Sequence, residues 1–195
     1  MKRFVLVLLE IVVIFGTLVL YRQYQDSFPN PNDAVIGHIS PIAKNTPGEV
    51  ENIKVVSTTP LAGNDNELVL LFRASRKSTS DHIAGYAIVK KSLFGWYVEK
   101  FQMIGRSPRP DGLIVGLSWS AGSKAVFGQV FLANATRVEA IFSDPSKGQI
   151  TSSTEIPNGN FVLFYSQFSE LLEFKILDSK GNVLKQFTKE ELQNG

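Results

Sequence analysis

Ser118 is the residue that comes closest to a hydrolase nucleophile. It lies in Gly116-Leu117-Ser118-Trp119-Ser120, whereas a nucleophile elbow places its serine between two glycines on a sharp strand-to-helix turn. The second glycine is missing here, and no helical period follows the segment. An alternating strand explains these residues better, with Leu117 and Trp119 in the core and the serines facing outward. We therefore predict no catalytic residue.

The residue types give little support for metal or phosphate chemistry. The chain has two histidines, His38 and His82, and no cysteine, which excludes a three-histidine zinc site, cysteine zinc sites, disulfides and thiolate catalysis. Asn64-Asp65-Asn66-Glu67 brings oxygen ligands together but lacks the remaining spacing of a calcium loop, so we interpret it as a polar turn. The sequence contains neither of two common glycine-rich phosphate-binding motifs, G-x-x-x-x-G-K and G-x-G-x-x-G. We predict no metal and no cofactor.

Basic side chains are concentrated in the middle of the chain. Residues 73–109 hold eight Lys or Arg against two acidic residues, although the whole chain carries a net charge of only +2. Such a segment is typical of contact with an anionic surface or polymer. The contact residues that we predict are Arg73, Arg76, Lys77, Arg106 and Arg109. The alternative is that alternating strands spread these charges around a solvated face.

Nucleic acid is not expected as the partner of these basic residues. Binding would need aromatic platforms beside the loops and a cytoplasmic location, and the N-terminal segment argues against that location. Phe4 to Leu20 is an apolar run of 17 residues broken only by Glu10. As a helix this run rises about 26 Å, near the lower limit for crossing a bilayer.

Two basic residues precede the apolar run, so the positive-inside rule sets its orientation. It predicts a single-pass signal-anchor helix over residues 4–22, a cytoplasmic stub and an extracytoplasmic remainder. A cleavable signal peptide is the alternative, but the small residues that cleavage needs are missing after the run. Glu10 either marks a contact between helices inside the membrane or is a tolerated carboxylic acid.

Beyond this helix we expect an extended linker and then strands. Residues 23–50 hold four prolines with several Asn and Gly, a composition that resists both helix and ladder. From residue 51, short segments rich in β-branched and aromatic residues alternate with turn signals such as Asn158-Gly159. The predicted strands are Ile53–Thr59, Glu67–Ala74, Ile83–Lys91, Gly95–Ile104, Leu113–Trp119, Ala125–Leu132, Arg137–Ser143, Gln149–Ile156, Phe161–Gln167, Leu171–Leu177 and Val183–Phe187.

These strands predict an all-β domain over residues 51–190. Their number and spacing favour a sandwich or a partly open barrel of about ten short antiparallel strands. A possible seam near residues 120–124 leaves open whether this region is one domain or two small modules. Only Thr188–Gln193 is expected to form a last turn of helix. The hydrophobic content of 44% is sufficient for a core.

A series of short motifs recurs in order along the strands. They read Leu70-Leu71-Phe72, Val89-Lys90-Lys91, Gly95-Trp96, Leu117-Ser118-Trp119, Phe127-Gly128 and Leu177-Asp178-Ser179-Lys180-Gly181. In this order they resemble a family of small membrane-anchored or lipoprotein-type β-domain proteins of Gram-positive bacilli. The resemblance spans about residues 51–187 and implies an anchored β-fold, but no activity. The lipid-bearing cysteine of that family is absent, so the helix would be the anchor.

Together these features predict a non-catalytic binding, sensing or scaffolding module at the cell envelope. Besides the membrane itself, the expected partner is an envelope protein or an anionic polymer. One alternative is an envelope-acting hydrolase with a site assembled from scattered carboxylates, whose pKa values would be driven apart. Another is a membrane-tethered structural subunit in which Glu10 contacts a partner helix.

Overall fold

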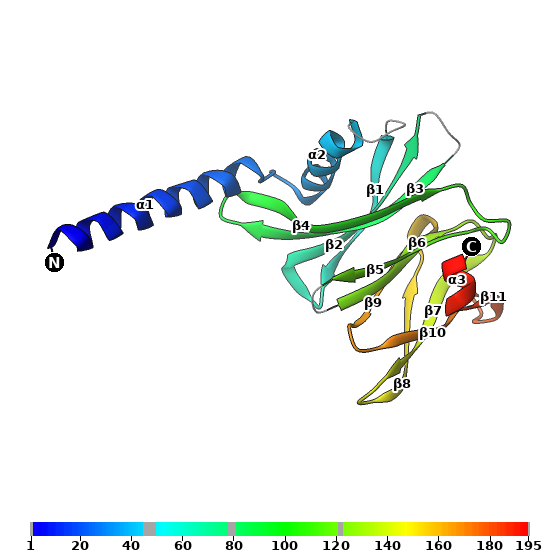
Figure 1. Ribbon diagram of the computed structural model, residues 1–195. Coiled ribbons are helices and arrows are strands. Elements are labelled where there is room, and N and C mark those ends of the chain that lie inside the picture. Colours follow the sequence, from blue (N-terminus) through cyan, green and yellow to red (C-terminus); the bar gives the residue numbers. More distant parts are fainter. Residues whose placement is uncertain (1, 45–49, 78–80, 121–122, 195) are drawn as a thin grey trace.

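The computed structural model describes residues 2–44, 50–77, 81–120 and 123–194, and Figure 1 shows its helices and strands. The strands are β1 (Val50–Leu61), β2 (Asn64–Arg76), β3 (His82–Ser92), β4 (Gly95–Arg106), β5 (Leu113–Ser120), β6 (Ser123–Val130), β7 (Ala135–Asp144), β8 (Gly148–Glu155), β9 (Asn160–Ser166), β10 (Glu170–Asp178) and β11 (Val183–Thr188). The helices are α1 (Lys2–Gln25), α2 (Pro31–Lys44), the short 3-10 helix η1 (Pro157–Gly159) and α3 (Lys189–Asn194). Each of the eleven predicted strands corresponds to an observed strand, and the predicted last helical turn is α3.

The strands form three antiparallel sheets. Sheet A has the order β1-β2-β3-β4, sheet B the order β5-β6-β9, and sheet C the order β11-β10-β7-β8. Strands of sheet A contact sheet B on one side, and β7 and β8 of sheet C contact β9 of sheet B. With α2 on the outer face of sheet A, the layers run α2, sheet A, sheet B and sheet C from top to bottom in Figure 1. The expected sandwich is thus extended by a third sheet.

Apolar clusters fill the three spaces between these layers. Ile39 of α2 packs with Phe72 against the outer face of sheet A. Between sheets A and B, the rings of Tyr86 and Phe127 meet edge to face with centroids 5.2 Å apart. Phe174 belongs to the largest cluster, between sheets B and C. Sheet B is therefore covered on both faces, which explains why its strands are nearly continuous apolar runs.

Helix α2 corrects the prediction of an extended linker over residues 23–50. Asn30 caps this helix, because its Oδ1 accepts a hydrogen bond from the Asp33 N–H at 2.9 Å. Pro31 takes the first helical position, where a missing N–H costs nothing. Val35 and Ile39 are then buried on sheet A. The proline content misled the prediction because Pro31 begins the helix instead of breaking it.

Helix α1 corrects the prediction of a membrane span. Among the described residues, no helix is long and apolar enough to cross a membrane. The predicted transmembrane helix over residues 4–22 is therefore wrong, and so are the fold class and the single-pass location built on it. Within α1, Glu10 interrupts the apolar run. Glu10 is exposed on α1. The contact predicted for it inside a membrane required a transmembrane helix, so that prediction is no longer supported.

Strands β5 and β6 pair across the predicted seam near residues 120–124. Leu117 pairs with Val126, and Ser120 pairs with Ser123, while residues 121–122 lie outside the described residues. The two strands are neighbours in sheet B. The two sides of the predicted seam thus belong to one sheet, and the number of domains stays a prediction.

Candidate binding groove

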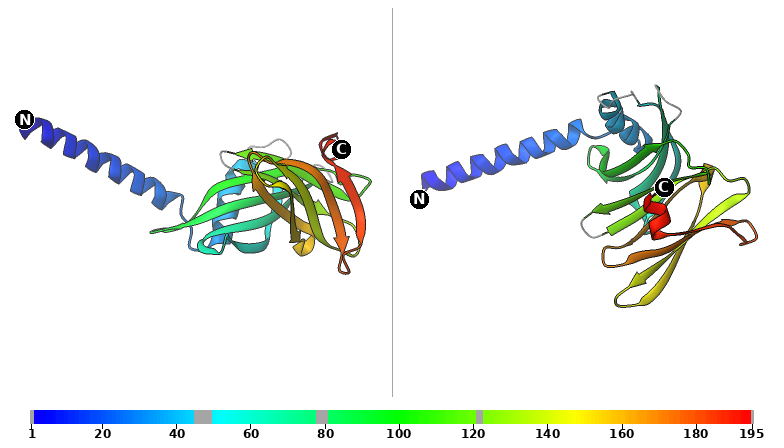
Figure 2. Two further views of the ribbon diagram at one scale, coloured as in Figure 1. Left: turned by 90° about the horizontal axis from the view of Figure 1, so that it is seen from below. Right: turned by 45° about the vertical axis from the view of Figure 1, so that its right-hand side comes forward.

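Sheet B is one strand narrower than sheet A, and this leaves strand β1 uncovered. Strands β4, β3 and β2 contact β5, β6 and β9 in turn, so that β1 extends beyond the edge of sheet B. Figure 2 shows the same stacking from two further directions. One edge of the A–B interface carries a groove beneath β1 and β2, and the opposite edge carries a cleft beside α3.

The β1 groove lies between β1 and β2 on one side and β8, η1 and β9 on the other. Its volume is about 520 Å³. Its apolar lining consists of Leu61, Val69, Leu71, Val162 and Phe164, and its other lining residues are Ser57, Thr59, Pro60, Thr154, Glu155 and Pro157. Ligand pockets commonly occupy about 300–1,000 Å³ and combine an apolar surface with a few polar groups. The β1 groove meets both criteria.

Strand pairing sets the lining of the groove. Thr59 pairs with Val69 and Ser57 pairs with Leu71, and residues two apart on a strand point to the same face. The pairing of β1 with β2 has three register shifts, and Pro60 has no N–H to donate. An irregular edge of this kind resists the addition of another strand. The groove therefore suits a compact ligand better than an extended peptide.

The predicted basic contact residues differ in their exposure and in their ion pairs. Arg73 is exposed on β2 and pairs directly with Lys54 of β1, which is also exposed. Arg76 instead forms an ion pair with Asp81, with 3.7 Å between nitrogen and oxygen. Lys77 is exposed after the end of β2. Contact of these residues with an anionic partner stays a prediction.

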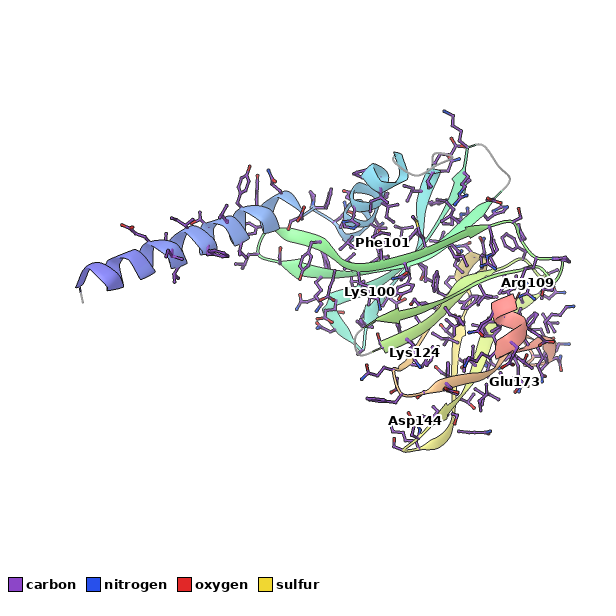
Figure 3. The ribbon with its side chains drawn as sticks, viewed as in Figure 1. Lys100, Phe101, Arg109, Lys124, Asp144 and Glu173 are labelled. Carbon is purple, nitrogen blue, oxygen red and sulfur yellow. The ribbon has the colours of Figure 1, made fainter. Side chains whose placement is uncertain are left out.

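The Arg106 cleft lies between β4, β5 and α3 and has a volume of about 380 Å³. Its lining residues are Gln102, Met103, Ile104, Arg106, Val115, Gly116, Leu117, Phe127, Leu192 and Gln193. Among these described residues, Arg106 alone is charged. Figure 3 shows Lys100 and Phe101 on opposite faces of β4, with Phe101 toward α2 and Lys100 toward sheet B. Alternation places Gln102, Ile104 and Arg106 on the face of Lys100.

Helix α3 forms one wall of the Arg106 cleft. A capping box begins it: the Glu191 N–H donates to Thr188 Oγ1 at 3.3 Å, and the Thr188 N–H donates to the Glu191 carboxylate at 2.7 Å. Arg109 donates from Nη1 to the Glu191 carbonyl and forms an ion pair with Asp111, both at 2.9 Å. The Arg109 guanidinium also lies 5.7 Å from the ring centre of Phe187. Arg109 thus holds α3 in place.

Ser118 is buried between sheets A and B, where its hydroxyl lies 2.9 Å from the Tyr86 hydroxyl. The prediction that Ser118 faces outward is wrong, because sheet B has no solvated face. Both histidines pack edge to face against phenylalanine rings. Among the described residues, Ser118 therefore has a tyrosine and not a histidine as its partner, and we assign it a structural role.

Asp144 begins the turn between β7 and β8, where Figure 3 labels it. Its Oδ1 accepts hydrogen bonds from the Ser146 hydroxyl at 2.6 Å and from the Lys147 N–H at 3.1 Å. Its Oδ2 accepts one from the Ser169 hydroxyl at 2.7 Å. These hydrogen bonds, that of the Ser146 hydroxyl above all, hold the pKa of Asp144 well below its usual value. Both oxygens of the Asp144 carboxylate are therefore occupied by hydrogen bonds that stabilise the turn.

The residues described contain no group of three or more His, Asp or Glu side chains that could hold a metal ion. A comparison with models of known protein families finds no match. A comparison with curated proteins finds no significant relative. The resemblance to the proteins of Gram-positive bacilli therefore stays a prediction. The assignment of function depends on the β1 groove and the Arg106 cleft.

Proposed function

We propose that the protein is a non-catalytic binding module that holds a compact apolar ligand in the β1 groove. The observation that carries this proposal is the groove itself, about 520 Å³ of open space lined by apolar side chains from two sheets. Its walls are strands fixed by hydrogen-bonded ladders, so little ordering of the protein is needed when a ligand enters. Preorganisation of this kind lowers the cost of binding.

The apolar lining supplies the main driving force. A ligand that removes about 200 Å² of apolar surface from water gains about 5 kcal/mol, at roughly 25 cal/mol per Å². Part of this gain is lost to the translational and rotational freedom that association removes. The hydroxyl groups of Ser57 and Thr59 on the rim can orient a polar group of the ligand. We therefore expect a moderate affinity with a preference for apolar ligands.

The alternative of a carboxylate-based hydrolase finds no support in the described residues. It would need two inward-facing carboxylates that share one cleft. Asp144 is the one buried carboxylate among the described residues, and its oxygens are occupied by the β7–β8 turn. Glu155 is the single carboxylate that lines the β1 groove in the described part of the chain.

Fluorescence of the neutral probe N-phenylnaphthylamine with the full chain tests the proposal. Thr59→Trp places a large side chain inside the groove, whereas Thr58→Trp adds the same bulk to the neighbouring exposed position, whose partner Leu70 belongs to the opposite face of the sheet. We expect Thr59→Trp to weaken probe binding at least about tenfold, or about 1.4 kcal/mol, and Thr58→Trp to leave it unchanged. Equal binding by both variants, with both folded by circular dichroism, would remove the groove as the site.

A second candidate function is contact with an anionic polymer or protein at the end of the β1 groove. Lys54 and Arg73 lie directly opposite each other on neighbouring strands, and like charges in this position repel. An anionic partner would relieve this repulsion. The double variant Lys54→Gln/Arg73→Gln should elute from a sulfated resin at lower salt than the control Lys147→Gln/Lys180→Gln, which removes equal charge from two exposed turns. Equal elution of the two variants would leave the pair without a special role.

A further inference from the structure

We infer that the Arg106 cleft binds a small, singly charged organic carboxylate, with the carboxylate group on the Arg106 guanidinium and an apolar body against sheet B. This site lies at the edge of the A–B interface opposite to the β1 groove. The inference therefore does not depend on whether the β1 groove binds an apolar ligand.

The charge of Arg106 is the first argument. Its neighbours Arg76 and Arg109 each form an ion pair, with Asp81 and Asp111. Arg106 is half-buried in the cleft, and its side chain has no ion pair or hydrogen bond within the part of the chain that the structure describes. A partly desolvated cation gains from a partner, and the planar guanidinium matches a carboxylate through two parallel hydrogen bonds.

The charge count favours a carboxylate over a phosphate. Arg106 gives the lining a single positive charge, and no described lining residue is acidic. One carboxylate neutralises that charge, whereas a phosphate monoester brings about −1.5 to −2 at pH 7. The side chains of Gln102 and Gln193 also line the cleft and offer amide N–H donors to a carboxylate oxygen.

The shape of the cleft accounts for the apolar body of the ligand. Gly116 belongs to its floor, where an added Cβ would lie 2.7 Å from the ring of Phe127. The absence of a side chain at Gly116 therefore lets the Phe127 ring lie directly against this position, beside Ile104 on the facing strand. A volume of about 380 Å³ accommodates a ligand about the size of one aromatic ring with its substituents.

The frame around Arg106 is rigid on both sides. Arg106 pairs with His82 at the end of the β3–β4 ladder, which fixes the base of its side chain. Arg109 holds the opposite wall, α3, by donating to the Glu191 carbonyl, and it also lies over the ring of Phe187 in β11. A ligand therefore meets a cation whose position is already set, and this favours binding.

NMR titration of the full chain with benzoate tests the inference, and benzamide serves as its neutral counterpart of nearly the same shape. We expect benzoate to shift the amide signals of Gly116 and Arg106 and to bind at least about tenfold more tightly than benzamide, as expected for a hydrogen bond to a charged group. Arg106→Gln should remove this difference. The control Arg137→Gln, which removes an exposed arginine from sheet C, should retain it.

Arg106→Lys separates charge from geometry, because lysine keeps the charge but loses the planar fork. We expect it to bind benzoate with an affinity between those of the wild type and Arg106→Gln. If benzoate and benzamide bind the wild type equally, or if Arg106→Gln retains the preference for benzoate, the inference is overturned. Circular dichroism and the dispersion of the NMR spectrum verify that each variant is folded. Binding of N-phenylnaphthylamine should be unchanged in all three variants.

Discussion

The β1 groove and the Arg106 cleft lie at opposite edges of the same interface and differ in the chemistry of their lining residues. At one edge β1 extends beyond the narrower sheet B and leaves an apolar groove with hydroxyl groups on its rim. At the other edge α3 covers part of the gap and leaves a smaller cleft with one half-buried cation. The two edges of one interface therefore carry two pockets of different chemistry.

The two pockets differ more in their walls than in their floors. Both pockets have apolar floors from sheet B, Phe164 in the groove and Phe127 in the cleft. Their polar groups come from the facing strands of sheet A, from β8 and from α3. A change in the shared sheet should affect both pockets, whereas a change in one wall should affect one pocket.

The largest effect is expected for a substitution in the sheet that both pockets share. A Cβ at position 128 would overlap the carbonyl group of Ile114 on the neighbouring strand. Gly128→Ala should therefore lower the free energy of unfolding by about 3 kcal/mol, as overpacking of a buried site does, and weaken both ligands together. Urea denaturation measures the change. Gly16→Ala, where a Cβ meets no atom within 4 Å, should cause no loss.

Leu192→Ala should open the cleft and leave the groove intact. Leu192 is 3% exposed and belongs to the cluster between sheets B and C. Its truncation should cost about 2–3 kcal/mol of stability and, by releasing α3, weaken benzoate binding. Binding of N-phenylnaphthylamine should not change. The exposed substitution Glu190→Ala on the same helix is the control, and an equal loss of benzoate binding in it would contradict a role of the α3 wall.

A smaller effect is expected for the hydroxyl pair between the two pockets. Tyr86→Phe and Ser118→Ala each remove one partner of a buried hydrogen bond of 2.9 Å. Each should lower stability by about 1 kcal/mol, and the double variant should lose less than the sum of the two. Thermal unfolding of the four proteins gives this coupling. Strictly additive losses would mean that the two hydroxyl groups do not interact in solution.

The smallest effect is expected for the pH dependence of stability, and it involves neither pocket. Hydrogen bonds from Ser146 and Ser169 lower the pKa of folded Asp144 below the value of about 3.9 for an unfolded chain. The stabilisation is thus complete above about pH 5 and is lost as the pH falls toward the folded-state pKa. Asp144→Asn should be less stable at pH 7 and lose less stability on acidification. If both proteins lose equal stability between pH 5 and 3, Asp144 does not contribute.

The sequence predicted the strands well because their periodicity is local. Segments such as Arg137 to Phe142 alternate between core and solvent, and the turns after Asp144 and Asp178 contain the residues that such turns require. Helix α2 was missed because four prolines in the segment outweighed a capping signal at Asn30 and Pro31. The membrane span was wrong because an apolar N-terminal run of this length lies at the lower limit for crossing a bilayer.

The two pockets could not be predicted from the sequence, because they depend on how sheets stack. Alternation on β1 places Ser57 and Thr59 on one face, yet nothing local shows that sheet B ends beneath them. Arg106 and Arg109 were predicted together as contact residues, although only the tertiary structure shows that Asp111 pairs with Arg109 and leaves Arg106 available. The sequence showed where the basic residues lie, but the different roles of Arg106 and Arg109 became clear only from the tertiary structure around α3.

Our proposal is that two independent binding sites lie at the two edges of one interface. Its most direct test is to titrate the wild type, Thr59→Trp and Arg106→Gln with both N-phenylnaphthylamine and benzoate, and to compare the six affinities. We predict that Thr59→Trp loses the neutral probe and keeps benzoate, and that Arg106→Gln loses benzoate and keeps the neutral probe. If each variant weakens both ligands equally, or neither variant weakens either ligand, the claim is contradicted.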